Sequence, residues 1–562
     1  MLRRPRAEPR RPVPRIPPAA PSEPRLVNVL RRRSLPVCLA LLVIGSLRIV
    51  TTYWVFNHTI DEPAHIACGM EWLDKKAYTY ETQHPPLARV MAALGPYLAG
   101  TRNLGYQGIY NEGAMLLAVG GHYERKLALA RLGILPFFWI AGLVTYWWAR
   151  RYWGPLTGLL AVFLFTVLPP VLAHGGLATT DMAVTAFVSA AILAMLVWVE
   201  RPNWWRGARF GACAGLAVLS KFSALVFLPA AAAVMLAAYV LTARPGLARL
   251  AGQARRLALA LGLAIVVACL VVWAGYRFSI GKAHFTDLRL PAPELYRGIE
   301  TVIDHNAKGH PSYLLGERSD YGFWYYYPVV LAVKTPLPFL ILLAIGAVLC
   351  VKKPRAVPCR MPASFSVGIL TVALFSSINI GVRHILAVYV GFSILAAIGV
   401  SEWLERSRRS KWRAWTLGVL LVWMAGSSAL AHPDYLAYFN ELVGDQPEKV
   451  LADSDLDWGQ DMKRLGKRLQ ELGAREVTFG RFIAAHFEEV LGFPPVRPGS
   501  PVEPSPGWNA VSITVWKVAR LGLYNEHPEV RLWPDVWKPT ERVGKGTLLY
   551  YVPPANLASP MR

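Results

Sequence analysis

The 562-residue chain has few charged residues and few cysteines. Asp, Glu, Lys and Arg make up only 17% of it, whereas a soluble domain has about 25%. Its six cysteines include no CxxC pair and no Cys/His spacing, so we expect neither a disulfide framework nor a structural zinc site. Hydrophobic residues make up 54% and the mean hydropathy is +0.32. These values exclude a soluble enzyme and a disordered chain, and they place most of the chain in a bilayer.

Acidic residues are scarcer than basic ones, 36 against 60, and the net charge is +24. The first 35 residues hold ten arginines and two glutamates, and much of the remaining positive charge lies in short loops between apolar runs. This distribution is typical of the positive-inside rule. A nucleic-acid-binding domain would instead carry a basic patch with stacking aromatic residues. We therefore expect no nucleic-acid partner.

Long apolar runs dominate the chain from residue 36 onward. A membrane-crossing helix needs about 20 apolar residues, and the sequence offers about eleven candidates. The predicted fold class is a polytopic α-helical membrane protein with a C-terminal extracytoplasmic α/β-like domain. The candidate spans are 36–56, 127–149, 155–173, 182–199, 209–220, 222–241, 257–274, 327–350, 361–379, 385–403 and 414–431.

The basic loops predict one orientation for all of these spans. With the N-terminus in the cytosol, the loops on that side are rich in Arg and Lys, whereas the outer turns 174–181, 220–221 and 380–384 carry only Lys221 and Arg383. The chain is therefore predicted to be a multi-pass protein of the plasma (inner) membrane. The first span has no Ala-x-Ala site after it, so we interpret it as an uncleaved anchor.

This orientation divides the chain into three parts. Residues 1–35 are predicted to be a disordered basic cytosolic arm. Residues 36–431 form the membrane domain with outer loops 57–126 and 275–326. Residues 432–562 form a soluble extracytoplasmic domain, with a helix near 459–472 and strands at Val511–Val518 and Leu548–Val552.

The first outer loop begins with adjacent carboxylates, Asp61 and Glu62. Asp61 before Glu-Pro is also a good helix N-cap. However, carboxylates at the mouth of a membrane helix are costly unless they are used. Asp61 could accept a proton from a hydroxyl nucleophile, and Glu62 could steer the substrate. Apolar residues recur at helical spacing from Ile66 and again from Leu87, which predicts two helices along the membrane surface.

Further polar residues are predicted to face the same side of the membrane. Asp181 begins the fourth span, where an N-cap is the alternative role. Lys221 lies between two apolar runs, where a snorkelling lysine is the alternative. Together with Arg89 and the Arg383-His384 pair, Lys221 could hold a lipid phosphate.

Two further segments have open interpretations. The aromatic run that includes Tyr326 and Tyr327 predicts an interfacial belt or a surface on which a sugar stacks. Lys334 follows inside a predicted span and needs a partner or a route to the interface. Asp residues alternate from Asp453 to Asp461, but an EF-hand loop would need Gly and Glu where Trp458 and Arg464 stand. A polar turn that caps the following helix is the interpretation of this run.

These segments together resemble the GT-C class of membrane glycosyltransferases, specifically the group of protein O-mannosyltransferases and bacterial aminoarabinose transferases. The resemblance extends over nearly all the chain after residue 35. It rests on short motifs in this order: Asp61-Glu62, His84-Pro85-Pro86-Leu87, Thr180-Asp181-Met182, Lys221, Tyr326-Tyr327-Pro328, Lys334-Thr335-Pro336, Gly381-Val382-Arg383-His384, the run from His432 to Asn440, and the turn 453–460.

The resemblance implies inverting transfer of a sugar from a polyprenyl-phosphate donor to an acceptor hydroxyl on a lipid, a glycan or a protein. It implies that Asp61 is the base, supported by Glu62 and Asp181. The donor phosphate would be held by Arg89, Lys221, Arg383 and His384, and substrate would contact His84, Tyr326 and Tyr327.

The chain has Gln83-His84-Pro85-Pro86 where aminoarabinose transferases tend to have Glu-Lys-Pro-Pro. No metal ligand is therefore assigned, and a divalent cation stays a possible cofactor. The competing hypothesis is a transporter or lipid flippase, although the polar residues gather at one face.

Overall fold

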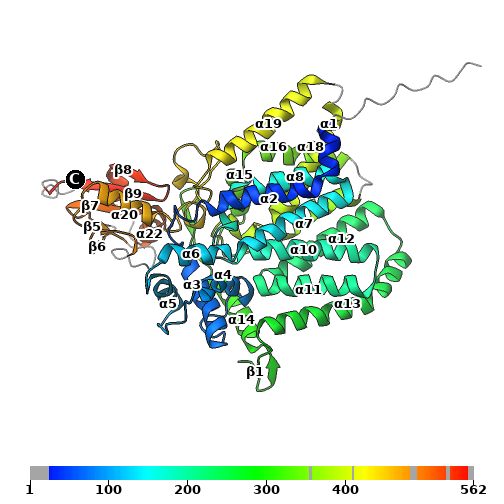
Figure 1. Ribbon diagram of the computed structural model, residues 1–562, viewed down its shortest axis with the longest axis horizontal. Helices are drawn as coiled ribbons and strands as arrows, with labels where there is room; N and C mark the ends of the chain where they lie inside the picture. Colours follow the sequence, from blue (N-terminus) through cyan, green and yellow to red (C-terminus); the bar gives the residue numbers. More distant parts are fainter. Residues whose placement is uncertain are drawn as a thin grey trace, which may run out of the picture.

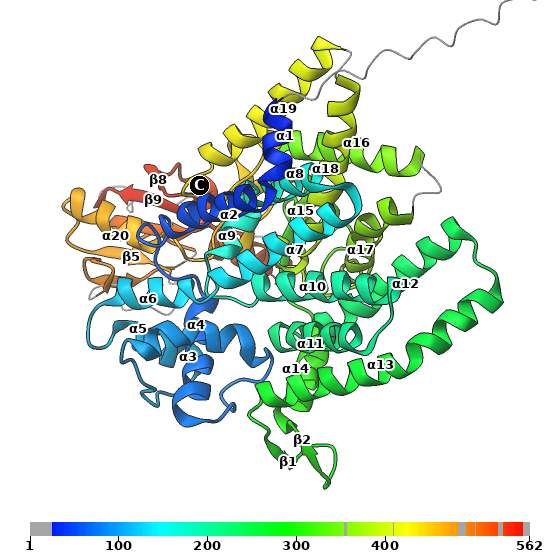
Figure 2. The same cartoon turned by 45° about the vertical axis from the view of Figure 1, so that its right-hand side comes forward.

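The computed structural model describes residues 25–352, 357–407, 410–480, 490–500, 502–526 and 532–554. Its main body is a bundle of apolar helices, and a smaller α/β domain lies at one end of the bundle (Figures 1 and 2). The helices of the bundle are α2 (Ser34–Val50), α6 (Tyr123–Leu132), α7 (Leu135–Trp153), α8 (Pro155–Thr166), α9 (Pro169–Gly175), α10 (Asp181–Glu200), α11 (Trp204–Ser220), α12 (Ala224–Ala243), α13 (Leu247–Gly275), α15 (Tyr326–Lys334), α16 (Leu337–Lys352), α17 (Val357–Ala373), α18 (Val388–Ser407) and α19 (Lys411–Leu430).

Each predicted span falls on one of these helices or on two consecutive ones. In the part of the chain that the structure describes, five helices are long and apolar enough to cross a membrane, or up to seven if each bent pair is one span. The prediction of a polytopic helical membrane fold with a C-terminal α/β domain is confirmed. The number of eleven crossings stays a prediction, because α2 and α17 are short and α11 and α19 are not among the seven.

Proline produces the two bends in the bundle. The pair α8 and α9 bends by 71° just before Pro169-Pro170, and the pair α15 and α16 bends by 116° at Thr335-Pro336. Proline has no amide donor and forces the preceding residue into extended backbone. At the second bend, Lys334 is 1% exposed, and its ammonium donates to the carbonyls of Leu436 (2.8 Å) and Asp455 (2.6 Å). The expected partner of this buried lysine is therefore the chain that follows the last span.

Short elements lie outside the bundle, in the two segments that the sequence predicted as outer loops. In the first outer segment they are α3 (Asp61–Met70), a π-helical turn η1 (Glu71–Lys75), α4 (Pro86–Leu98) and α5 (Ile109–Ala118). In the second they are the hairpin β1 (Ile280–Lys282) and β2 (Arg289–Pro291), then α14 (Pro293–Lys308), and the hairpin β3 (Ser312–Leu314) and β4 (Glu317–Ser319). The turn η2 (Val382–Ile385) links α17 to α18.

The prediction of a surface helix from Ile66 onward is wrong for α3. Every residue from Glu62 to Met70 is buried, because α4 and α5 cover this helix. Gly69 makes the close approach possible, since a Cβ there would lie 1.9 Å from the carbonyl oxygen of Arg89. In α4 the small residues face α3, and the predicted apolar side with Leu94 and Leu98 is the more exposed one.

The C-terminal domain is built on a five-stranded mixed sheet in the order β6-β5-β7-β9-β8. Strand β5 pairs in parallel with β6 and β7, and β9 pairs antiparallel with β7 and β8. The elements are η3 (Pro447–Lys449), η4 (Asp453–Asp455), α20 (Met462–Glu471), β5 (Val477–Phe479), β6 (Val496–Pro498), β7 (Gly507–Ser512), α22 (Ile513–Glu526), α23 (Trp533–Val536), β8 (Glu541–Val543) and β9 (Thr547–Val552).

Most of the sequence predictions for this domain hold. The helix predicted near 459–472 is α20, and the strand predicted at Leu548–Val552 lies in β9. The strand predicted at Val511–Val518 is wrong beyond Ser512, where helix α22 begins. The Ser512 hydroxyl accepts the amide N–H of Val515 (3.3 Å), which is the contact of a helix N-cap.

The predicted cytosolic arm is only partly covered by the structure. Residues 1–24 lie outside the described residues. From Arg25 the chain is helical rather than disordered, in α1 (Arg25–Arg32) and then α2. The proline-rich composition ends at Pro24, and Leu30 packs against the bundle core, so apolar contacts with the bundle support this helix.

Candidate active site

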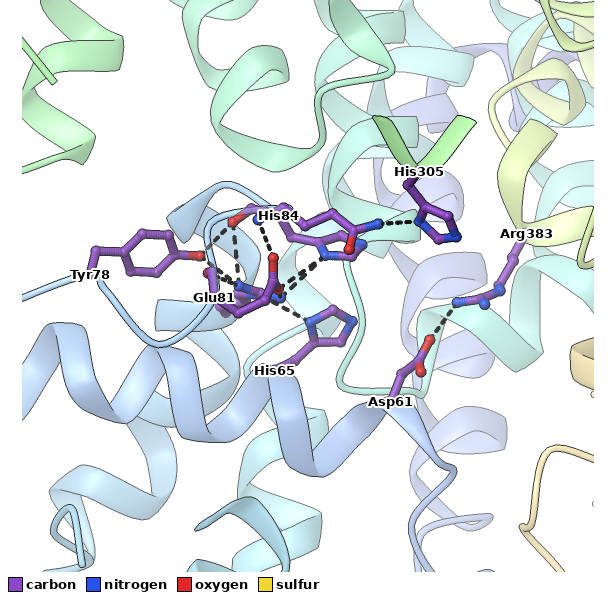
Figure 3. A network of polar contacts seen from close by, with 9 residues as sticks. Asp61, His65, Tyr78, Glu81, His84, His305 and Arg383 are labelled. Carbon is purple, nitrogen blue, oxygen red and sulfur yellow. Dashed lines mark hydrogen bonds and ion pairs between the residues drawn. The ribbon is translucent and has the colours of Figure 1, made fainter. Parts of the chain in front are cut away.

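The centre of the outer end is an ion pair between Asp61 and Arg383. Asp61 is the first residue of α3, and its Oδ2 accepts a hydrogen bond from Arg383 Nη1 at 2.9 Å (Figure 3). The Asp61 side chain is 24% exposed and caps no backbone N–H of α3, so the N-cap alternative does not describe it. Arg383 Nε is buried without an acceptor among the described residues. The guanidinium therefore keeps unused capacity for an anion.

A second carboxylate–cation pair lies at the start of α10. Lys221 Nζ donates to Asp181 Oδ1 at 2.7 Å, and the Thr179 hydroxyl donates to Asp181 Oδ2 at 3.2 Å. Asp181 also makes no N-cap contact. Its carboxylate is buried, whereas the Lys221 side chain is 14% exposed. The lysine is therefore the member of this pair that a ligand can reach.

Glu62, next to Asp61, is enclosed in the protein. Both of its carboxylate oxygens accept hydrogen bonds from Arg131 at 2.8 Å, and the backbone N–H groups of Thr59 (2.8 Å) and Ala178 (2.9 Å) complete the set. Burial raises the pKa of Glu62, but Arg131 and these hydrogen bonds outweigh burial and hold it below its usual value. Glu62 thus fixes the start of α3 against α6 and the segment before α10.

Arg131 was not among the predicted site residues. It lies inside the predicted span 127–149, where an uncompensated arginine needs a buried partner. That requirement was the sequence signal for the Glu62–Arg131 pair.

Arg89 is also engaged by groups of the protein around it. Its guanidinium is 1% exposed and forms an ion pair with Glu81. It also donates to the Tyr78 hydroxyl (3.1 Å) and to His65 Nδ1 (3.1 Å). Burial raises the pKa of Glu81, yet Arg89 and His84 bring it down to about 2. The structure therefore uses Arg89 to hold the loop before α4, and a phosphate would have to displace Glu81 to bind it.

The histidines of the site carry little positive charge. His84 contacts Glu81 and Arg89 and packs edge-on against His65 (5.2 Å between ring centroids). Burial lowers the pKa of His84, and Glu81 only partly offsets this. Burial and the neighbouring Lys221 and Arg383 hold the pKa of His384 well below its usual value. Near neutral pH both rings act as hydrogen-bonding groups rather than as cations.

The second outer segment brings further imidazoles to this end. His305 of α14, labelled in Figure 3, contacts the Gln83 amide (2.7 Å) and His310 (3.3 Å). In the described residues, no group of three or more His, Cys, Asp or Glu side chains has the spacing of a metal site. A divalent cation therefore has no assigned ligand set.

Tyr326 and Tyr327 are part of the bundle core. Tyr326 is 2% exposed and Tyr327 1% exposed, and the Tyr327 hydroxyl donates to the carbonyl of Ile378 (3.2 Å). Neither ring offers a free face, so a sugar could stack on them only if this region opened. The exposed aromatic residues of the same run are Tyr321 and Trp324.

The alternating Asp run, residues 453–461, is here named the docking strip. The prediction that it caps the following helix is wrong: Asp461 precedes α20 but caps none of its N–H groups. The strip instead binds the membrane part. Asp455 Oδ1 accepts the N–H of Val382 (3.1 Å), and the Trp458 carbonyl accepts the N–H of Ile60 (3.1 Å). These contacts lie directly before Arg383 and Asp61.

The other side of the docking strip binds the α/β domain. Asp457 Oδ2 accepts the Ser512 hydroxyl (2.5 Å), and Asp461 Oδ2 accepts the N–H groups of Lys545 (2.9 Å) and Gly546 (3.0 Å). Asp455 thus binds the membrane part, whereas Asp457 and Asp461 bind the α/β domain. Sequence alone identified the run but not this use, because its partners are more than 50 residues away.

Comparisons with known proteins agree with this architecture. Residues 126–273 match the family model described as dolichyl-phosphate-mannose-protein mannosyltransferase. The fold matches ArnT from Cupriavidus metallidurans bound to undecaprenyl phosphate with a TM-score of 0.50 and 14% identity, over 93% of this chain and 99% of that one. The apo form of ArnT gives 0.48 at the same identity and coverage.

An archaeal oligosaccharyltransferase, AglB from Archaeoglobus fulgidus, gives a TM-score of 0.44 at 13% identity, over 70% of this chain and 56% of that one. No curated protein matches the sequence. The chain therefore has the fold of ArnT, and its residues 126–273 are similar to the mannosyltransferase family. This similarity to the protein O-mannosyltransferase and ArnT group is the one that the sequence motifs predicted.

Proposed function

We propose that the protein transfers a sugar from a polyprenyl-phosphate donor to an acceptor hydroxyl at the end of the bundle that carries Asp61 and Arg383. The observation that carries the proposal is the 2.9 Å contact between these two side chains. It places a carboxylate that can accept a proton beside a guanidinium that can hold a phosphate. An ArnT structure of the same fold contains undecaprenyl phosphate, which supports a lipid-phosphate donor.

The proposed chemistry is a single displacement. The acceptor oxygen attacks the anomeric carbon while Asp61 takes the hydroxyl proton. The bond from the anomeric carbon to the phosphate oxygen breaks on the opposite side, so the sugar configuration inverts. The electron pair stays on the lipid phosphate, whose charge Arg383 and Lys221 neutralise.

The other predicted residues receive more specific proposed roles. Glu62 and Asp181 position the reacting pairs, because their carboxylates are held by Arg131 and Lys221. Arg89 and His84 maintain the loop that borders the site. His384 offers a neutral hydrogen bond to the donor.

The proposed orientation follows from charge. The basic loops at the other end of the bundle lie in the cytosol, so the site and the α/β domain face away from it in the plasma (inner) membrane. The acceptor is a lipid, a glycan or a protein on that side.

The test uses the purified protein in proteoliposomes. Undecaprenyl phosphate carrying radiolabelled mannose or aminoarabinose is added with extracted envelope lipids, glycans and proteins as acceptors. We expect label to move into a glycosidic linkage and free undecaprenyl phosphate to appear. A transporter or flippase would instead move labelled lipid across sealed vesicles without forming a new bond, and that result would overturn the proposal.

A further inference from the structure

We infer that Trp458 of the docking strip is a positioning residue for the Asp61–Arg383 pair, and that the C-terminal domain thereby supplies part of the active site. The inference rests on the function proposed above. Trp458 is 1% exposed and belongs to a run whose predicted role, capping of the following helix, the structure contradicts. It contacts both halves of the ion pair by two different parts of its structure.

The backbone of Trp458 fixes where α3 begins. Its carbonyl oxygen accepts the N–H of Ile60 (3.1 Å), the residue immediately before Asp61. The next carbonyl, of Gly459, accepts a hydrogen bond from the side-chain Nδ2 of Asn57 (2.8 Å), and the side-chain Oδ1 of Asn57 accepts the N–H of Lys463 (3.1 Å). The four residues that lead into α3 are thus tied to the strip at two points.

The indole ring of Trp458 fixes the cation. The guanidinium carbon of Arg383 lies 4.1 Å from the ring centroid, which is the geometry of a cation–π contact. The indole covers one face of the guanidinium and leaves its edge for Asp61 and for an anion. Because both groups are buried, the ring also keeps water from this face.

The strip itself has little freedom to move. The hydroxyl of Ser454 donates to the carbonyl of Ile380, and Gly381 between Ile380 and Val382 has φ +125°. A Cβ on Gly381 would lie 2.4 Å from the Ser454 oxygen. Lys334 holds the strip from the bend of α15 and α16 through the Asp455 carbonyl. The indole therefore has one defined position relative to Arg383.

Trp458 acts through Arg383 and Ile60 rather than on the substrate. A displacement of about 1 Å between reacting groups can cost about 100-fold in rate. Loss of the indole would let the guanidinium move away from the line between Asp61 and the phosphate. The expected consequence is a slower transfer step rather than weaker binding of the acceptor.

The test compares two substitutions in the full-length protein. Trp458→Phe keeps the backbone contact and an aromatic face, and Trp458→Leu keeps only the backbone contact. With the radiolabelled donor, we expect the leucine variant to lose about 100-fold in kcat with little change in acceptor KM, and the phenylalanine variant to recover most of it. Trp508→Leu, in the same domain but packed against Tyr551, is the control and should keep kcat.

A double-mutant cycle separates positioning from a general structural role. In an Arg383→Lys background, Trp458→Leu should cause little further loss, because its effect passes through the guanidinium. Equal losses in both backgrounds, or a wild-type rate in Trp458→Leu, would overturn the inference.

The same cycle on the unfolding temperature needs no substrate. If the wild-type protein transferred no sugar, the proposed function would fail, and this second cycle would still decide the inference. A coupling between Trp458 and Arg383 supports the positioning contact, and additive shifts overturn it.

Discussion

Asp61 and Arg383 are 322 residues apart in the chain and are joined by a 2.9 Å ion pair. One begins the first outer helix and the other lies in a short turn between two late helices of the bundle. Their contact means that the first outer loop and the turn at 380–384 lie at the same end of the bundle. It also gives the phosphate a competitor, because an incoming anion must share Arg383 with Asp61.

Replacement of the proposed base should abolish transfer without unfolding the protein. Asp61→Asn keeps an oxygen that accepts from Arg383 but cannot take a proton. We expect a loss of about 100-fold to 10,000-fold in kcat, measured as transfer of labelled sugar. Asp304→Asn on the exposed side of α14 is a control of the same chemistry and should be unaffected. Wild-type-like transfer by Asp61→Asn would remove the assignment of the base.

Arg383 and Arg89 should respond differently when each is replaced by glutamine. Arg383→Gln removes a cation with an unpartnered Nε, so its affinity for undecaprenyl phosphate should fall by about tenfold or more. Arg89→Gln removes the partner of Glu81, so it should lower the unfolding temperature and change lipid affinity little. Titration of undecaprenyl phosphate in a thermal-shift assay measures both effects. The reverse pattern would place the donor phosphate at Arg89.

The Glu62–Arg131 pair should dominate the stability of the outer end. Glu62→Gln leaves Arg131 buried without a counter-charge, and such a change costs about 3–5 kcal/mol. Thermal unfolding in detergent should show the loss, and Glu62→Gln combined with Arg131→Met should recover part of it. A double variant less stable than the single one would argue against a pair that acts as a unit.

Asp453 should make the protein less stable as the pH rises. Burial raises the pKa of Asp453 from 3.8 to about 6, with help from Asp61 and Asp455 and against the effect of Arg383. The folded state therefore binds a proton more tightly than the unfolded state, so this contribution is lost between about pH 4 and pH 6. Asp453→Asn should flatten that part of the pH dependence of the unfolding temperature. Identical pH curves for the two proteins would contradict the prediction.

The sequence was sufficient to predict the helical architecture and to place the main polar residues at one end of the bundle, whereas the side of the membrane stays a prediction. Apolar runs predicted helices or bent pairs throughout the bundle, because an apolar run of this length is stable only as a helix that is buried in protein or faces lipid. The asymmetry of basic loops placed Asp61, Asp181, Lys221 and Arg383 together, and the structure gathers all four at one end as two ion pairs.

Pairing was the part that the sequence could not supply. Arg89 lies at the same end of the bundle as the site and has the charge to bind a phosphate. However, Glu81, eight residues earlier, forms an ion pair with its guanidinium. Tyr326 and Tyr327 have the composition of a stacking surface, but the bend at Thr335-Pro336 turns α15 into the core. Choosing among such partners needs distances, and residue spacing along the chain gives only the face of a helix.

The two-sided bonding of the docking strip bears on how this protein can be recombined. Asp455 binds the membrane part and Asp457 binds the α/β domain, so the strip is a structural part of both. A chimera that exchanges the C-terminal domain at residue 432 would import a foreign strip against a native catalytic turn. A junction placed after residue 461 keeps the native strip. The foreign sheet then has to bind only the carboxylates of Asp457 and Asp461.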